Sequence, residues 1–180
     1  YLSGYWQCEK YFKEFRAELL ELFRFPQNQI NEASRKMQDQ ICREQAVAVH
    51  VRRGDYLLPE NNRKYGNICN LQYYRNAMQY MKEKVSDARF YFFSNDPEWV
   101  RENLSEGDSV IVNCNHGKEN YLDMYLMSQC SHNIIANSSF SWWGAWLNRN
   151  PDKIIVSPKR WFSHLDVSDA VCEDWIRING

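Results

Sequence analysis

Long apolar stretches are absent from this sequence of 180 residues. No run of about 18 apolar residues occurs, so the sequence predicts no transmembrane span. The opening segment, YLSGYWQCEKYF, also lacks the basic region and the apolar stretch of a signal peptide. It begins without a methionine, and we therefore expect the chain to be a fragment of a longer protein.

A basic excess is absent too, because the formal net charge is −1. Nucleic acids and anionic membrane surfaces usually require such an excess, so neither is expected as a partner. The six cysteines include no C-x-x-C pair. This distribution favours reduced thiols in a reducing compartment over a disulfide framework or a zinc site.

The common nucleotide-binding motifs are missing as well. Neither a G-x-x-x-x-G-K-[ST] loop nor a G-x-G-x-x-G segment after a strand occurs, which disfavours a P-loop enzyme and the usual dinucleotide site. There is no Asp-x-Asp pair of the kind that holds a divalent metal on a sugar nucleotide. Internal repeats and linkers rich in Gly, Ser or Pro are also absent, so we expect a single domain.

What the sequence contains is an alternation of short apolar strands with helical segments. The expected strands are 47–51, 89–94, 109–113, 133–137 and 154–158, and the expected helices are 9–25, 71–84, 97–104, 118–130 and 140–148. Strands that are apolar on both faces and alternate with helices are typical of a parallel sheet covered on both sides. The sequence therefore predicts an α/β fold with a doubly wound, Rossmann-like parallel sheet of about five strands.

Polar side chains follow four of these strands. They are Arg52, Arg53, Gly54 and Asp55; Ser94, Asn95 and Asp96; Asn113, Asn115 and His116; and Asn137, Ser138 and Ser139. In folds of this kind, ligands bind outside the carboxyl ends of the strands. We therefore expect these groups to converge on a binding site at one edge of the sheet.

The last of these turns precedes a helix that should begin near Phe140. A helix N-terminus stabilises a phosphate through its unpaired backbone N–H groups and its dipole, and Ser138 and Ser139 would add donors or cap the helix. An arginine from the first strand would hold the other side with a bidentate fork. The pattern indicates a clamp for a diphosphate that needs no metal.

Most of these residues also have a purely structural interpretation. Arg52 or Arg53 would pair with Asp55 or Asp96, and Asp123 would be a solvated acid on its helix. Helical spacing places Trp142, Trp143 and Trp146 in the core, and the histidines His116 and His132 show no spacing that suggests a metal site.

The tripeptide Arg53-Gly54-Asp55 leaves an alternative from another class, an adhesion module that displays it. Such display requires a long exposed loop. Here the tripeptide follows directly from a buried strand, which disfavours this alternative.

Three segments closely resemble the α-1,2-fucosyltransferases: HVRRGDY at 50–56, FFSNDPEW at 92–99, and DMYLMSQCSHNIIANSSFSWWGAWLN at 123–148. The resemblance extends from GYWQ at residue 4 to PKRWF at residue 162. It implies one half of a GT-B-type enzyme that transfers L-fucose from GDP-fucose to the 2-hydroxyl of a galactoside on a glycan. The transfer would proceed with inversion and without a metal or other cofactor, and a different nucleotide-sugar transferase on the same frame is the alternative.

The resemblance also implies roles for individual residues. Arg52 would hold the β-phosphate, with Arg53 beside it, and His50 and Asp123 would bind the guanosine. Asp96 would line the nucleotide pocket, and Ser138, Ser139 and Phe140 would present backbone N–H groups to the diphosphate. Asp55 and Glu60 are the candidates for the base that activates the acceptor hydroxyl.

The chain departs from the family pattern in two places. The glycine-rich GGLGNQMF-type opening is absent, and Ser131 stands where a lysine is common. We therefore expect residues 1–45 to be a helical linker and residues 46–180 to be the GDP-fucose-binding domain, without the N-terminal domain of the full enzyme. The expected location is the cytoplasm for a bacterial protein and the Golgi lumen for an animal one.

Overall fold

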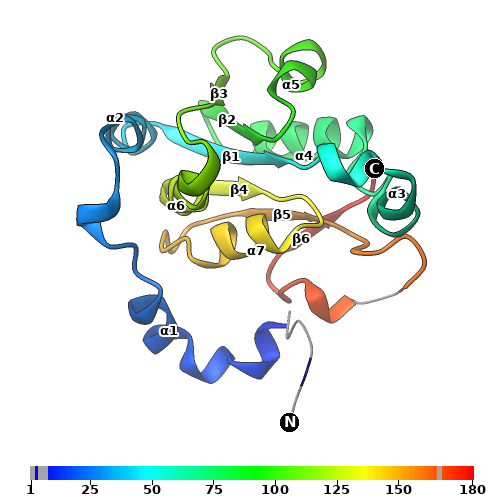
Figure 1. Ribbon diagram of the computed structural model, residues 1–180, viewed down its shortest axis with the longest axis horizontal. Helices are drawn as coiled ribbons and strands as arrows, with labels where there is room; N and C mark the ends of the chain where they lie inside the picture. The colour runs from blue at the N-terminus through cyan, green and yellow to red at the C-terminus, as the bar shows by residue number, and fades with distance from the viewer. Residues whose placement is uncertain (1–2, 4–7, 166–167) are drawn as a thin grey trace.

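Six parallel strands form one sheet within the residues that the structure, a computed structural model, describes: 3, 8–165 and 168–180. Their order is β3-β2-β1-β4-β5-β6 (Figure 1). The strands are β1 Gln45–Val51, β2 Ala88–Ser94, β3 Val110–Val112, β4 His132–Ile134, β5 Ile155–Pro158 and β6 Ile176–Ile178. The strand order reverses between β1 and β4, so the carboxyl ends of these two strands form the topological switch point.

Helices cover both faces of the sheet (Figure 1). One face carries α4 Leu71–Lys84 and α5 Pro97–Asn103, and the other carries α2 Glu32–Ile41, α6 Tyr121–Gln129 and α7 Ser139–Trp146. Two shorter helices, α1 Arg16–Leu22 and α3 Pro59–Tyr65, lie outside these layers. The predicted doubly wound α/β fold is confirmed, with six strands where about five were expected.

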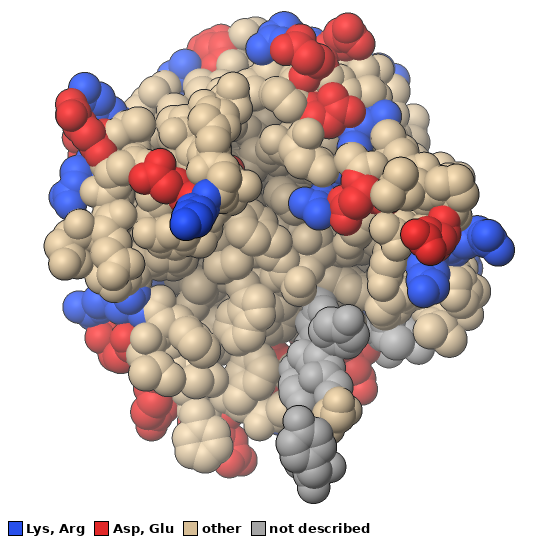
Figure 2. All heavy atoms as spheres, viewed as in Figure 1, with Lys and Arg blue, Asp and Glu red and all other residues tan. Residues whose placement is uncertain are grey.

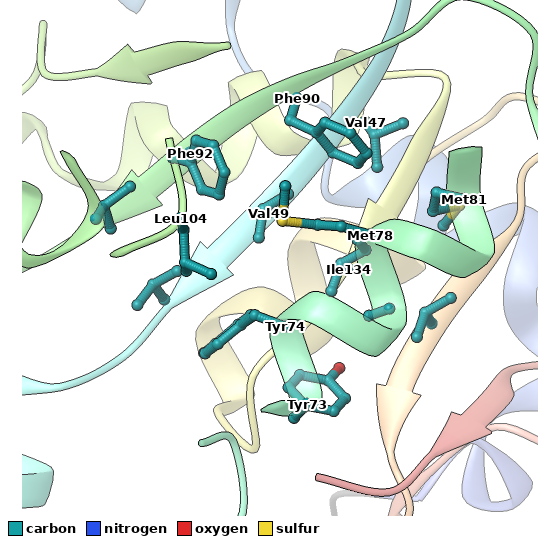
Figure 3. Packing of buried hydrophobic residues seen from close by; sticks show 14 of the residues in the cluster. Val47, Val49, Tyr73, Tyr74, Met78, Met81, Phe90, Phe92, Leu104 and Ile134 are labelled. Carbon is teal, nitrogen blue, oxygen red and sulfur yellow. The ribbon is translucent and has the colours of Figure 1, made fainter. Parts of the chain in front are cut away.

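The core on the α4 side is built from alternate residues of the strands. Val47 and Val49 of β1 are fully buried there and share one cluster with Phe92 of β2. Tyr74 and Met78 of α4 pack onto the same cluster (Figure 3). Because side chains alternate across a strand, the other residues of β1 must face the opposite helix layer.

That opposite face of β1 carries Ala46 and Ala48, which pack with Leu122 and Leu126 of α6. The same alternation puts His50 on the α6 side, at the carboxyl end of β1. The hydrophobic pattern of one strand thus decides where a candidate site residue points.

The tryptophans of α7 belong to a third core cluster. Trp142 and Trp146 are almost completely buried, and their rings lie parallel with centroids 6.3 Å apart. Phe12, from the N-terminal segment, stacks on Trp143 at 5.8 Å. The prediction that these tryptophans belong to the core is confirmed.

The N-terminal segment is less regular than the single helix predicted over 9–25. It forms two short 3-10 turns, Glu9–Tyr11 and Lys13–Phe15, before α1 begins at Arg16. Tyr11 and Phe15 are 65% and 58% exposed, so the apolar residues of this segment do not share one buried face. The predicted helical period was wrong because it counted these exposed aromatic residues as part of a core-facing stripe. The residues GYWQ at 4–7 lie outside the described residues.

Three further elements were not predicted: helix α3, strand β6 and helix α2. The edge strand β6 has only three residues and is only partly buried, so it carries little apolar signal. Helix α2 was taken for a polar stretch, yet its Ile41 is buried in the same cluster as Leu122 of α6. Helix α2 therefore packs on the sheet domain, and the expected division between residues 45 and 46 stays a prediction.

No described helix combines the length and the apolar character needed to cross a bilayer. All six cysteines are unpaired. On the face of the molecule shown in Figure 2, basic and acidic residues are interspersed and no large patch of one sign forms.

Candidate functional site

A cleft of about 430 Å³ opens at the carboxyl edge of the sheet. It lies beside the ends of β1, β2 and β3 and the first turns of α6 and α7. The side chains around it include His50, Arg52, Asn113, Asn115, Asp123 and Phe140. The predicted convergence of polar groups from separate strands is thus present, and four of the predicted site residues line this one cleft.

His50 is 5% exposed and lies against the ring of Phe140, with ring centroids 5.7 Å apart. Its Nδ1 atom is buried and has no hydrogen-bond partner among the described residues. Burial, and to a lesser degree the positive charge of Arg52, lowers the pKa of His50 to about 3. The imidazole is therefore neutral at physiological pH, with one unsatisfied polar atom at the edge of the cleft.

Arg52 lines the cleft and is only about one-third exposed. Its Nη2 atom lies 2.9 Å from Oδ1 of Asp55, an ion pair whose geometry does not meet the angular requirements of a hydrogen bond. The structural interpretation of this arginine is therefore correct in part. Since an arginine carries five donors, one carboxylate contact leaves most of the guanidinium available.

Arg53 points away from the cleft. Its Nε donates to Oδ2 of Asp96 at 3.1 Å, and its guanidinium lies 4.1 Å from the ring centroid of Trp99. Asp96 uses its other oxygen to accept the Trp99 N–H and cap α5. Neither charged residue lines the cleft. Both are engaged with each other, and their expected contact with a donor nucleotide stays a prediction.

The turn before α7 has a different capping arrangement from the predicted one. Ser138 is the N-cap residue, but its side chain makes no capping hydrogen bond. The first backbone bond of the helix runs from Trp142 N–H to the Ser138 carbonyl at 3.0 Å. The N–H groups of residues 139–141 therefore have no intrahelical partner, as an anion site requires. Phe140 lines the cleft, whereas Ser138 and Ser139 do not.

Asp123, on the first turn of α6, accepts a hydrogen bond from Asn115 Nδ2 at 2.8 Å through its Oδ1 atom. Burial raises the pKa of Asp123, and the hydrogen bond from Asn115 opposes that rise. Its Oδ2 atom accepts no hydrogen bond from any described residue. A partly buried carboxylate with one free oxygen suits a ligand that offers donors.

The two candidate bases are placed differently. Asp55 is held against Arg52. Glu60 is exposed on the first turn of α3 and does not line the cleft. The structure therefore brings Asp55, and not Glu60, next to another predicted site residue.

The matching family model, that of glycosyl transferase family 11, covers residues 1–179. The chain belongs to this family. It is 38% identical over 179 residues to an α-1,2-colitosyltransferase of Escherichia coli, and 32% identical to the O-antigen biosynthesis glycosyltransferase WbnK of the same species. These alignments cover 97% and 98% of the chain and 61% and 60% of the two relatives. The chain thus spans about three-fifths of their length.

The galactoside α-(1,2)-fucosyltransferase 1 of Ateles belzebuth matches 103 residues at 38% identity, which is 56% of this chain and 28% of that protein. Among solved structures, an α-1,6-fucosyltransferase NodZ soaked with GDP-fucose matches at 16% identity with a TM-score of 0.42, over 77% of this chain and 59% of that one. The resemblance to the α-1,2-fucosyltransferases is confirmed as family membership.

The structure also shows the surroundings of the two histidines and of the Arg53-Gly54-Asp55 tripeptide in this family 11 chain. His132 accepts a hydrogen bond from Ile154 N–H through Nδ1 at 3.0 Å and is structural, whereas His116 is exposed and lines the cleft. The side chains of Arg53 and Asp55 are held in ion pairs with Asp96 and Arg52, which disfavours display of the adhesion tripeptide.

One group of potential metal ligands occurs in the described part of the chain, formed by Glu9, Cys172 and Asp174. It lies outside the cleft, and Glu9 already accepts hydrogen bonds from Arg16 and Trp146. Burial holds the pKa of the Cys172 thiol far above its usual range, which disfavours the thiolate that a metal requires. We therefore interpret these three residues as part of the packing around α7 and not as a metal site.

Residues of α2 were missed as part of the site. Ser34, fully buried, and Asn31 both donate hydrogen bonds to Asn115, which in turn contacts Asp123. The segment N-E-A-S, with an asparagine before good helix formers and apolar residues at Met37 and Ile41, carries a helix-start signal that could have revealed it.

Proposed function

We propose that this chain supplies the donor-binding part of an enzyme that transfers L-fucose from GDP-fucose to the 2-hydroxyl of a galactoside, with inversion and without a metal. Family membership supports glycosyl transfer. The observation that supports the nucleotide diphosphate is the cleft, where Arg52, the α7 N-terminus and Asp123 lie around one space of about 430 Å³.

The guanine base is assigned to the Asp123 end of the cleft. Guanine presents two donors, N1–H and N2–H, on one edge, and a carboxylate accepts both, whereas adenine offers no matching pair. The free Oδ2 of Asp123 is available to such donors, and His50, whose buried Nδ1 has no partner among the described residues, lines the same cleft. We infer that these two residues bind the guanosine.

The diphosphate is assigned to Arg52 and the first N–H groups of α7. Departure of GDP places negative charge on the β-phosphate, and preorganised donors at developing charge are usually the largest catalytic contribution. Loss of one such donor raises the barrier by about 3 kcal/mol, or about a hundredfold in rate. Arg52 is already oriented by Asp55, so little reorganisation accompanies binding.

Of the two candidate bases, Asp55 lies nearer the proposed donor site, since its carboxylate is ion-paired with Arg52, whereas Glu60 does not line the cleft. An acceptor hydroxyl that attacks from the face opposite GDP must lose its proton to a nearby group. Inversion requires this opposite-face attack. Asp55 would serve as the base only if its carboxylate reaches the acceptor side of the sugar; otherwise it orients Arg52, and the base comes from elsewhere.

The remaining part of the active site is assigned to the portion of the relatives that this chain does not span. A GT-B-type site lies between two domains, and proximity and orientation account for roughly 7 to 11 kcal/mol of barrier reduction in well-oriented reactions. We therefore expect the 180-residue chain to bind nucleotide but to transfer little or no sugar.

Calorimetric titration with GDP, GMP and ADP in the presence of EDTA tests the proposal. GDP should bind without added metal, more tightly than GMP because of the second phosphate and more tightly than ADP because of the base. Equal affinity for GDP and GMP would contradict the proposed binding of the second phosphate by Arg52 and the α7 N-terminus. Absence of any GDP binding would refute the proposed function as a whole.

The identity of the sugar needs a separate measurement, because one relative is named as a colitosyltransferase. Colitose is L-fucose without its 3-hydroxyl group. Competition of GDP-fucose, GDP-colitose and GDP-mannose against GDP would rank the sugars. A clear preference for GDP-mannose would favour a different nucleotide-sugar transferase on the same frame.

A further inference from the structure

A chain of hydrogen bonds centred on the buried Asn115 connects the start of α2 to Asp123. Oδ1 of Asn115 accepts from Asn31 Nδ2 at 3.0 Å and from Ser34 Oγ at 2.9 Å. Nδ2 of Asn115 donates to Asp123 Oδ1 at 2.8 Å. Ser34 and Asn115 are 0% and 5% exposed, so the bond between them is buried, whereas the bonds to Asn31 and Asp123 are partly buried.

The direction of every bond in this chain is determined by the cap of α2. Oδ1 of Asn31 accepts the Ser34 backbone N–H at 2.7 Å, the capping bond of the helix. The amide of Asn31 must therefore turn its Nδ2, a donor, toward Asn115. The atom of Asn115 that faces it must be the acceptor Oδ1. Asn115 is then left with its own Nδ2 facing Asp123.

The opposite orientation of the Asn115 amide is excluded by the same partners. It would set an NH2 group against the NH2 group of Asn31, and it would set an oxygen against the Asp123 carboxylate. Two donors facing each other and two acceptors facing each other would leave several buried groups unsatisfied, each at a cost of about 1–3 kcal/mol. Asn115 therefore presents a donor to Asp123 and to no other charged group.

We propose that Asn115 is a positioning residue for nucleotide recognition: held by Asn31 and Ser34, it engages Oδ1 of Asp123 and leaves Oδ2 to accept the donors of the guanine base. This inference rests on the proposed binding of GDP. It assigns to α2, which lies beside α6 in Figure 1, a part in base selectivity.

The pH dependence of GDP binding follows from this geometry. Asp123 must be ionised to accept two donors, and burial raises its pKa while Asn115 opposes that rise. The other titratable or charged groups facing the same space are His116 and Cys114 after β3, His50 of β1, and Arg52 directly after β1. In the wild-type protein GDP affinity should be constant around neutral pH and should fall as Asp123 protonates in acid.

The sharpest test is Asn115→Asp, which replaces the donor Nδ2 with an oxygen and changes almost nothing in shape. Near pH 8 the introduced carboxylate repels Asp123, and GDP should bind about tenfold more weakly or worse, with a smaller preference over ADP. On acidification the two carboxyl groups share a proton, since like charges in contact raise the pKa of the pair. The shared proton restores the donor, so GDP affinity should rise as the pH is lowered from 8, opposite to the wild type.

Asn113→Asp is the matched control, because Asn113 is an exposed residue of the same cleft and has no hydrogen bond to Asp123 among the described residues. It adds the same charge and should weaken GDP and ADP alike, without a rise on acidification. Ser34→Ala removes one donor from Asn115 and should narrow the GDP-over-ADP ratio about threefold to tenfold without adding charge. Thermal unfolding of each variant establishes that it is folded.

The possible outcomes separate the two claims. If the wild type binds GDP in preference to ADP while Asn115→Asp and Asn113→Asp give parallel pH profiles, the positioning role is overturned and the proposed function stands. If the wild type shows no preference for GDP over ADP, base recognition by Asp123 fails, and the inference fails with it.

Discussion

The replacement His50→Phe should make the free protein more stable and GDP binding weaker. Nδ1 of His50 is buried and has no partner among the described residues, although the ring is 95% buried against Phe140 and the sheet. A buried unsatisfied polar atom costs about 1–3 kcal/mol, and an apolar ring of similar shape avoids that cost. After allowance for the larger ring, we expect a net gain of about 1 kcal/mol, or roughly 2–4 °C in Tm for a chain of this length.

The same substitution removes an acceptor that the nucleotide is expected to use. Loss of that hydrogen bond should weaken GDP binding by about 1–3 kcal/mol, roughly 5- to 150-fold. At a GDP concentration of about 100 times the wild-type Kd, the ligand adds about 2.7 kcal/mol to wild-type stability, and a variant with a hundredfold higher Kd gains only about 0.4 kcal/mol. At this hundredfold loss the order of the two Tm values should reverse when GDP is added, and a smaller loss should still reduce the Tm gain that GDP gives the variant.

His132→Phe is the matched control, because His132 lies on the neighbouring strand β4 with 6% exposure and its Nδ1 accepts the Ile154 N–H at 3.0 Å. Its loss leaves that N–H without a partner and should lower the Tm with or without GDP. Differential scanning calorimetry and titration with GDP measure both effects. The reasoning is refuted if His50→Phe lowers the Tm of the free protein and leaves the GDP affinity unchanged.

The stability of the wild type should also depend on pH through His50. Its pKa is about 3 in the folded protein, against 6.5 for an unperturbed histidine, chiefly because of burial. Below pH 6.5 the unfolded chain therefore binds a proton that the folded chain does not, so the free energy of unfolding decreases as the pH falls. The contribution of this residue is at most about 1.4 kcal/mol per pH unit, and it should disappear in His50→Phe.

Three other substitutions probe the cleft and its support. Arg52→Lys should weaken GDP binding by about 1–3 kcal/mol and GMP binding much less, because a bidentate fork becomes a point charge. Equal losses of affinity for both nucleotides would show that another residue binds the diphosphate. Gly54→Ala places a Cβ 2.2 Å from Nδ2 of Asn95, whose Oδ1 holds the backbone of the same loop, so it should weaken GDP binding severalfold in calorimetry; an unchanged affinity would show that this loop is not part of the site. Asn137→Ala should lower the unfolding free energy by about 2–4 kcal/mol in urea titration, because the buried amide donates to two backbone carbonyls and accepts from a thiol. A change within about 0.5 kcal/mol, as is usual for surface substitutions, would show that these hydrogen bonds do not stabilise the fold.

The fold was largely determined by local sequence. Apolar alternation located β1 and β2 to within one or two residues, and helical period gave α4 over 71–84, as the structure has it. These elements are buried on at least one whole face, so their residue pattern records their surroundings. The placement of polar residues at the ends of the strands followed, because parallel strands of a doubly wound sheet present their carboxyl ends at one edge.

Short or polar elements lack such an apolar residue pattern. Strand β6 is a partly buried edge of three residues, and α2 buries little more than Ser34 and Ile41 within the helix. Their structure depends on the sheet and on α6, which lie far away in the sequence. Propensity over so few residues is weaker than these tertiary contacts.

The different roles of the two adjacent arginines, Arg52 and Arg53, were decided only by the tertiary structure. Residue chemistry alone shows two equivalent guanidinium groups after a strand, and only the family resemblance singled out Arg52 for the β-phosphate. In the fold, Asp96 and Trp99 at the start of α5 engage Arg53, and Arg52 alone reaches the cleft. The same is true of Asp123, whose free oxygen depends on Asn115 and, through it, on the cap of a helix about 90 residues earlier in the chain. Side-chain chemistry was visible in the sequence, whereas the partner of each side chain depends on which distant elements pack together.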